Sequence, residues 1–245
     1  MVKILLLLYF NKIEARNFSL QNIHIEMKNK QGLLWWESID KVEVGVDECA
    51  RGCLLGRTYT AAVIWSPEFL EEAEESEEYD WIHKIKDSKK LSVKLREMLS
   101  EQIKAHCLDY AIMWADEKTI DQKNILQAVQ GCFHQSLDSL QLIPDKIFVD
   151  GTVFNSYYDK DFNLIPHVCV VKGDNTYLNI ASASILAKVA HDNYIKELCE
   201  AHPELSEKYD ISNNMGYGTA SHLKGIETHG ITDFHRKTFG ICKTF

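Results

Sequence analysis

The segment Val44 to Gly56, VGVDECARGCLLG, places two adjacent acids, Asp47 and Glu48, at the end of a strand-like run. Side chains alternate across a regular strand, so neighbouring acids on it would point to opposite faces of the sheet. Either one of the two is an idle surface charge, or the backbone bends and both side chains serve one site. Further acids along the chain bear on this choice.

Strand-like and helix-like segments alternate after residue 40. The apolar periodicity predicts strands over 42–48, 58–65, 109–116, 145–151 and 167–174, and helices over 92–106, 122–142 and 179–199. Ser92 is the expected N-cap of the first of these helices. Strands that alternate with helices indicate an α/β layered fold, with a mixed sheet and helices on its faces.

Composition and charge narrow the class of protein. With 45% hydrophobic and 26% charged residues, the chain of 245 residues has an ordinary globular balance. Seven cysteines without a CxxC pair favour neither a zinc ribbon nor a complete disulfide framework, and indicate a reducing compartment.

The net charge of −9 argues at first against a nucleic-acid partner, which normally needs a basic surface. The run 68–80, however, holds eight acids and no base, so the rest of the chain carries only −9 + 8 = −1. A local basic site is therefore possible. We expect the acidic run to be an exposed insertion, either a solvated loop or a helix face.

The N-terminal apolar run, Ile4 to Phe10, is too short to span a bilayer, and no small-residue cleavage site follows it. Residues 1–40 show no clear period. We expect them to be an N-terminal extension of uncertain structure, followed by one domain over residues 41–245.

Three of the expected strands end in acids: Asp47 with Glu48, then Asp150, then Asp174. Ligand sites in α/β sheets gather beyond the carboxyl ends of strands, so these acids could converge on one point. Clustered carboxylates repel one another unless cations lie among them, and oxygen-only ligands favour Mg²⁺ or Mn²⁺. Taken singly, an Asp beside Gly is more often only a turn residue.

The sequence around these acids resembles ribonuclease HII, the type 2 ribonuclease H family. The resemblance rests on five segments that occur in the family's order over about residues 41–240. They are GVDECARG (45–52), DSKKLS (87–92), VDG (149–151), VVKGDNTYLNIASASILAKVAHD (170–192) and NMGYGTASHLKGIETHGITDFHRKTF (214–239).

The resemblance implies an RNase H-like fold with a C-terminal helical portion, and a catalytic domain over residues 41–245. It implies hydrolysis of the RNA strand of RNA–DNA hybrids and cleavage at ribonucleotides embedded in DNA, leaving 5′-phosphate and 3′-hydroxyl ends. The family's catalytic and metal-binding carboxylates fall on Asp47, Glu48, Asp150 and Asp174, which would hold two Mg²⁺ or Mn²⁺ ions. It also implies that the first strand ends at its acids, so that both can face the phosphate.

Further residues acquire candidate roles in substrate binding. Ala50, Arg51 and Gly52 occupy the family's Gly-Arg-Gly loop near the ribose 2′-hydroxyl, the group that distinguishes RNA from DNA, and Tyr217 matches a tyrosine that packs on the same sugar. Ordinary packing of a tyrosine is the alternative. The candidates for phosphate or active-site contacts are Lys89, Lys172, Ser184 and Lys188, and the weaker ones are Lys90, His222, His235 and Arg236.

Ser184, Lys188 and Asp192 share one helical stripe, for which a solvated helix face is the alternative explanation. Ala50 departs from the family pattern, because its Cβ penalises a positive φ that glycine adopts freely. We therefore expect weaker cleavage at a single ribonucleotide, relative to hybrid, than a glycine at this position would give. Ser182 in place of alanine and His191 in place of arginine are changes that could be neutral.

Two other classes stay open. A non-catalytic hybrid-binding protein is expected to have lost a metal ligand, and none is lost here. Another two-metal nuclease on the same fold is disfavoured by the intact ARG and GYGT segments, while DECARG fits type HII better than ribonuclease HIII. We expect a cytoplasmic monomer that acts on nucleic acid and does not bind a membrane.

Overall fold

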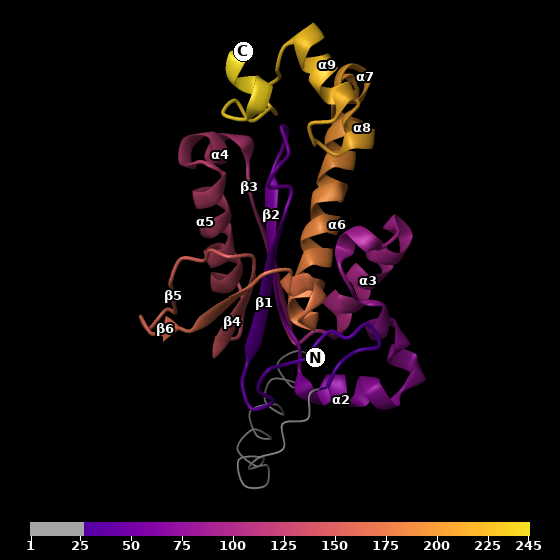
Figure 1. Ribbon diagram of the computed structural model, residues 1–245, viewed down its shortest axis with the longest axis vertical. Coiled ribbons are helices and arrows are strands. Elements are labelled where there is room, and N and C mark those ends of the chain that lie inside the picture. Colours follow the sequence, from indigo (N-terminus) through magenta and orange to yellow (C-terminus); the bar gives the residue numbers. More distant parts are fainter. Residues whose placement is uncertain (1–26) are drawn as a thin grey trace.

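The sheet at the centre of the molecule has five strands in the order β3-β2-β1-β4-β7 (Figure 1). The computed structural model describes residues 27–245. Strands β1, β2 and β3 pair antiparallel, whereas β1, β4 and β7 run parallel, so the sheet is mixed as predicted. The strands are β1 (Glu43–Cys49), β2 (Thr58–Ile64), β3 (Asp109–Ala115), β4 (Lys146–Asp150) and β7 (His167–Val170).

Helices cover both faces of this sheet (Figure 1). Helices α3 (Val93–His106) and α6 (Leu178–Ala201) pack on one face, and α5 (Ile125–Asp138) packs on the other. The helix predicted over 122–142 is present as α5, but it begins only at Ile125, because Asn124 has a φ of +69° and separates α4 (Glu117–Lys123) from α5. The Asn124 side chain caps α5 by accepting a hydrogen bond from the Gln127 N–H.

The predicted C-terminal helical portion is confirmed. It lies at the far end of α6, against the connection between β1 and β2 (Figure 1). It consists of α7 (Pro203–Tyr209), α8 (Ile211–Asn214), α9 (Ala220–His229) and η4 (Gly240–Thr244). Smaller elements are β5 (Tyr157–Tyr158), β6 (Leu164–Ile165), η2 (Ser88–Lys90) and η3 (Gly173–Asn175).

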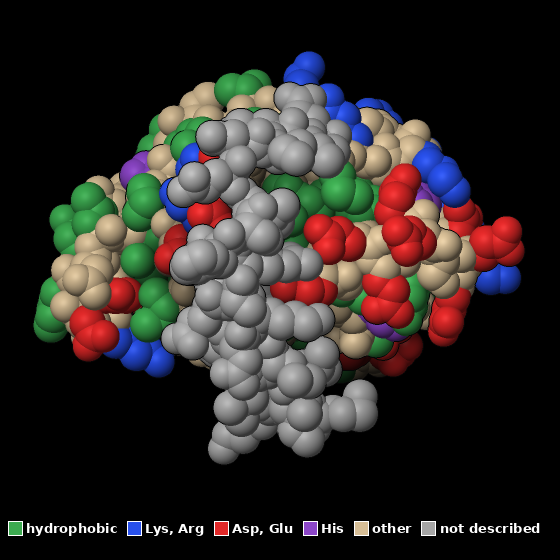
Figure 2. All heavy atoms as spheres, turned by 90° about the horizontal axis from the view of Figure 1, so that it is seen from below, with side chains coloured by type: hydrophobic (Ala, Val, Ile, Leu, Met, Phe, Trp, Pro, Cys, Tyr) green, Lys and Arg blue, Asp and Glu red, His purple; other side chains and the backbone are tan. Residues whose placement is uncertain are grey.

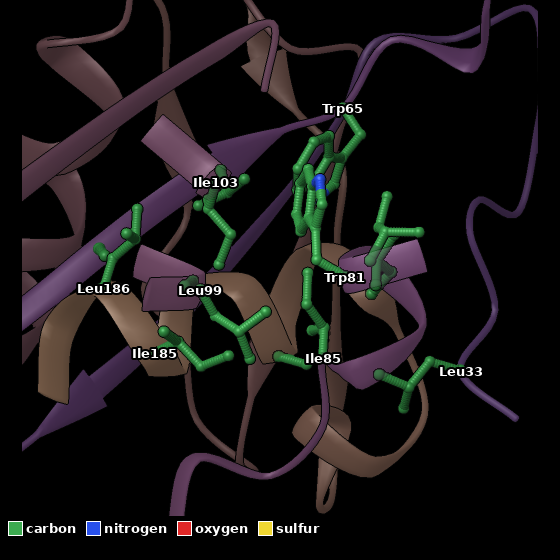
Figure 3. Packing of buried hydrophobic residues seen from close by; sticks show 14 of the residues in the cluster. Leu33, Trp65, Trp81, Ile85, Leu99, Ile103, Ile185 and Leu186 are labelled. Carbon is green, nitrogen blue, oxygen red and sulfur yellow. The ribbon is translucent and has the colours of Figure 1, made fainter. Parts of the chain in front are cut away.

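The core between the sheet and α6 depends on a close approach at Gly45. A Cβ added to Gly45 would lie 2.4 Å from the backbone carbon of Asn179, so only glycine lets α6 lie this close to β1. Figure 3 shows the large side chains of this layer, among them Trp65, Leu99 and Leu186. This packing determines how closely α6 approaches β1, the strand that carries Asp47.

Part of the expected N-terminal extension contributes to the same layer. Leu33 and Trp35 are both buried in it, and Figure 3 includes Leu33. The Leu34 N–H donates to the Thr176 carbonyl, and the Leu178 N–H donates to the Leu34 carbonyl. The apolar run 4–10 lies outside the described residues. Within residues 27–245, no helix is long and apolar enough to cross a membrane.

The acidic run 68–80 is a helix face, as one of our two expectations had it, but it is not a detached insertion. It forms α2 (Pro67–Glu75), capped by Ser66, and most of η1 (Glu77–Lys84). Leu70, Ala73 and Trp81 are buried in the core. The acids lie on the outside, where Figure 2 shows acidic side chains gathered on the end of the molecule that carries α2.

Candidate active site

Strand β1 continues through both of its acids. The expectation that it ends at them is wrong: its pairing with β2 runs as far as Cys49 and Tyr59. Its ladder with β4 stops earlier, at Val46 and Val149. Asp47 and Glu48 therefore lie on a segment that is hydrogen-bonded to a strand on one side only, and the chain turns just beyond them, at Ala50, with a φ of +66°.

Asp150 and Asp174 reach this place from two other segments. Asp150 is the last residue of β4, as predicted. Asp174 is not at a strand end, because β7 stops at Val170 and Lys172 adopts a left-handed conformation that starts the η3 turn. Asp150 Oδ1 accepts a hydrogen bond of 2.7 Å from the Gly173 N–H, and this bond ties the turn that carries Asp174 to the end of β4.

The carboxylates of this cluster affect one another's charge. Burial, then the charges of Glu48 and Asp150, raise the pKa of Asp47 well above its usual range. Burial raises the pKa of Glu48 as well, although Arg51, whose Nη1 lies 3.5 Å from Glu48 Oε1, opposes the shift. Burial, Asp87 and Asp150 raise the pKa of Asp174. A cation among these oxygens would relieve the repulsion.

The acids interact as charges rather than as a ready-made ligand shell. Within residues 27–245, no three His, Cys, Asp or Glu side chains are grouped closely enough to hold a metal ion. Asp47 Oδ1 accepts from the Glu48 N–H, and Asp174 Oδ1 accepts from the Asn175 side-chain amide. One oxygen of the Asp47 carboxylate and one of the Asp174 carboxylate thus already accept a hydrogen bond.

Ser184 lies directly beside Asp47. Burial raises the pKa of Asp47 and the Ser184 hydroxyl lowers it, while the same hydroxyl lies 3.0 Å from the hydroxyl of Ser88 in the DSKKLS segment. Both serines are buried. The stripe formed by Ser184, Lys188 and Asp192 is therefore not a solvated helix face, because Ser184 and Asp192 are buried and Lys188 is half-buried.

Lys188 and Asp192 form a buried polar group with Arg96, a residue that the sequence did not point to. Lys188 Nζ lies 2.7 Å from Asp192 Oδ1, and Arg96 Nη2 lies 3.0 Å from Asp192 Oδ2. Arg96 Nη1 also donates to the carbonyls of Ser88 and Leu91 and so fixes the DSKKLS segment. A helical wheel offered the signal, because Arg96 shares the buried face of α3 with Leu99 and Ile103.

The remaining predicted lysines lie at the rim. Lys89 is exposed in the DSKKLS segment, and its charge lowers the pKa of Asp174 in opposition to the acids around it. Lys172 is exposed at the start of η3. Lys90 Nζ donates to the side chain of Asn175 at 2.8 Å, which joins the DSKKLS segment to η3.

Tyr217 lies at the other side of the acids, against the turn after β1. It pairs with Cys53 across this turn, burial raises the pKa of its hydroxyl, and 36% of the residue stays exposed. Lys188 Nζ lies 5.8 Å from the centre of its ring. Arg51 and Gly52 are exposed beside it. Part of Tyr217 is therefore within reach of a ligand.

His222, His235 and Arg236, the weaker candidates, are all fully buried. They lie behind the turn 50–56 and Tyr217 rather than at the surface. No local sequence pattern marks this position, because the turn and Arg236 are joined only by the fold.

Comparison with solved structures defines the class of this fold. A ribonuclease H2 from Pyrococcus horikoshii OT3 has 23% sequence identity and a TM-score of 0.65, over 82% of this chain and 95% of that chain. Bst-RNase HIII in complex with Mn²⁺ has 16% identity and a TM-score of 0.55, over 76% of this chain and 70% of that chain. The chain therefore has the RNase H-like fold.

The sequence comparisons define the family. The model described as ribonuclease HII matches residues 44–242. A ribonuclease HII of Bacteroides thetaiotaomicron is 40% identical over 209 residues, which are 85% of this chain and 94% of the relative. One from Cytophaga hutchinsonii is 38% identical over 208 residues, 84% of this chain and 93% of that one. The chain belongs to the ribonuclease HII family and is a ribonuclease H.

Proposed function

We propose that this enzyme hydrolyses the RNA strand of RNA–DNA hybrids and cleaves at ribonucleotides embedded in duplex DNA, leaving 5′-phosphate and 3′-hydroxyl ends. The observation that carries the proposal is that Asp47, Glu48, Asp150 and Asp174, from three chain segments, lie near enough at one end of the sheet for the charge of Asp150 to raise the pKa of the other three. We propose further that it acts as a cytoplasmic monomer and that residues 41–245 form its catalytic domain.

Asp47, Glu48, Asp150 and Asp174 are the proposed ligands of two divalent cations, Mg²⁺ or Mn²⁺. The set suits hard cations, because it offers only oxygen atoms and its acids raise one another's pKa. The complex of Bst-RNase HIII with Mn²⁺ supports this choice. Bound there, the ions would activate a water molecule and stabilise the leaving oxygen.

The other side chains would position the substrate and the acids. Ser184, whose hydroxyl lies 3.0 Å from that of Ser88, would favour the charged form of Asp47. Lys89 and Lys172, both exposed, would contact phosphates. Lys188, held by Asp192, adds a positive charge between the acids and Tyr217.

The turn Ala50–Gly52 and Tyr217 would recognise the ribose. The exposed ring of Tyr217 offers a flat apolar surface for the sugar, and the backbone of the turn lies beside it. Contact with the 2′-hydroxyl is what would restrict cleavage to ribonucleotides.

The test of the metal site combines chelation with one substitution. Asp174→Asn is expected to abolish cleavage while the protein stays folded and binds hybrid nearly as well, because the change removes charge at the site and little packing. EDTA should abolish cleavage by the unchanged enzyme. Asp161→Asn, at an exposed acid of the β5–β6 turn, is the matched control and should cleave normally. Cleavage that persists in EDTA would contradict the two-metal mechanism.

A further inference from the structure

Arg236 is a buried charge whose hydrogen bonds go to the backbone. It is fully buried, and within residues 27–245 it forms no ion pair. Its three donor nitrogens bond instead to backbone carbonyls: Nε to Gly56 at 2.9 Å, Nη1 to Arg51 at 3.0 Å, and Nη2 to Ala50 at 2.8 Å. Burial of an unpaired guanidinium is unfavourable, so these carbonyl dipoles must compensate for its lost hydration.

All three carbonyls belong to the turn that leaves β1. In a trans peptide the N–H points opposite to the C=O of the same plane. Because Arg236 holds the carbonyls of Ala50 and Arg51, it also directs the N–H groups of Arg51 and Gly52 away from the protein interior. Both residues are exposed, and neither N–H has an acceptor within residues 27–245. Two unpaired donors therefore face outward beside Tyr217.

His235, the residue before Arg236, fixes Tyr217 in a similar way. The Thr232 N–H donates to His235 Nδ1 at 2.9 Å, so the proton of this ring is on Nε2. His235 Nε2 lies 3.1 Å from His222 Nε2, which must accept, and His222 Nδ1 then donates to the Tyr217 carbonyl at 3.0 Å. The consecutive residues His235 and Arg236 thus hold both sides of one small surface.

Arg236 also bears on the unusual conformation of Ala50. The φ of +66° places Ala50 in the left-handed region, which its Cβ disfavours. The hydrogen bond from Arg236 to the Ala50 carbonyl favours this conformation, since it is made only when the peptide plane is so oriented.

We infer that Arg236 is a positioning residue, which holds the Ala50–Gly52 turn ready to donate to the 2′-hydroxyl of a ribonucleotide. The inference rests on the proposed function of that turn. A single ribonucleotide in DNA offers one 2′-hydroxyl, whereas a hybrid offers one at every nucleotide of the RNA strand. Loss of Arg236 should therefore impair cleavage at the single ribonucleotide more than cleavage of the hybrid.

The experiment compares kcat/KM on a DNA duplex with one ribonucleotide and on a continuous hybrid. Arg236→Lys keeps the charge but cannot reach three carbonyls, and it should lower the ratio of the two values by about tenfold. Arg96→Lys, at the buried arginine that fixes the DSKKLS segment, is the matched control. It should affect both substrates alike and leave the ratio within about twofold.

Rescue separates positioning from general destabilisation. Glycine adopts a positive φ without the Cβ penalty, so adding Ala50→Gly to Arg236→Lys should restore the ratio by at least about threefold. A ratio in folded Arg236→Lys equal to that of the wild type, or an equal fall in Arg96→Lys, overturns the inference. A wild type that cuts neither substrate overturns the proposed function instead.

A second comparison applies if Arg236→Lys alone does not fold. The double variant is then compared with Ala50→Gly alone, and equal ratios in these two overturn the inference. A double variant that also fails to fold overturns it too, because Arg236 would then support the fold and not the turn in particular.

Discussion

His235 is held neutral by the backbone N–H that points at its Nδ1. Burial, with the neighbouring His222, lowers its pKa to about 4 from an ordinary value of 6.5. An unfolded chain binds a proton at this residue between those two pH values, and the folded protein does not. This residue therefore contributes stability that is complete above pH 6.5 and is lost as the pH falls towards 4.

We predict that His235→Gln flattens the pH dependence of unfolding. The wild type should lose about 3 kcal/mol through this residue between pH 6.5 and 4, and the variant should lack that part of the slope. Denaturant unfolding at several pH values measures it. His229→Gln, at an exposed histidine, is the control and should keep the full slope. Equal slopes in the wild type and His235→Gln would contradict the prediction.

The contact between β1 and α6 depends on one missing side chain. We predict that Gly45→Ala destabilises the protein by about 3 kcal/mol or more, because the new methyl group meets the backbone of Asn179 and Ile180 at 2.4 Å and must push α6 outward. Cleavage should fall as well, since α6 carries Ser184 and Lys188.

The control for this prediction is a glycine with open space around it. Gly131 lies inside α5, and a Cβ there would meet nothing within 4 Å. Gly131→Ala should therefore stabilise the protein by about 0.5 to 1 kcal/mol through helix propensity. Thermal unfolding that shows the same effect for both substitutions would mean that the approach of α6 is not sterically limited.

Helix α2 combines a buried and a charged face, so deletion and charge removal should have opposite results. Deletion of residues 68–80 removes Leu70 and Ala73 from the core and should unfold the protein. Replacement by glutamine of the five exposed acids should keep the fold and tighten hybrid binding at low salt but not above about 0.15 M. These acids are Glu72, Glu74, Glu75, Glu77 and Glu78. Binding titrations at two salt concentrations test this, and equal affinities at low salt would place the acids too far from the substrate.

At the scale of the molecule, residues 27–40 join the N-terminal side of α6 to the core. We predict that a chain beginning at residue 41 is less stable by several kcal/mol than one beginning at residue 27, because it loses the buried Leu33 and Trp35. It also loses the two hydrogen bonds between Leu34 and residues 176 and 178, beside the turn that carries Asp174. Comparison of the two chains by denaturant unfolding and cleavage tests this. Equal stability would support a domain boundary at residue 40.

Local patterns were enough to predict where along the chain the five strands of the main sheet lie, the helix α6 and the strand-end position of Asp150. Apolar periodicity and strand-end acids are properties of short segments, and they survive without knowledge of the fold. The same patterns missed two breaks in regular structure. Asn124, with a positive φ, separates α4 from α5, and Lys172, also with a positive φ, starts the turn that carries Asp174 after β7 has ended. They also did not predict where β1 ends, because its pairing with β2 continues beyond its pairing with β4.

The candidate residues of the site could be predicted from the sequence alone, since the acids, the ARG turn and Tyr217 are recognisable one segment at a time. It did not reveal what holds them. Arg236 bonds to a carbonyl 186 residues away, and Arg96 and Ser88 each reach α6 across 96 residues. Such contacts depend on how the layers pack and leave no periodic trace in the chain. Buried polar groups need partners in every fold, but only the packed structure determines which partners they find.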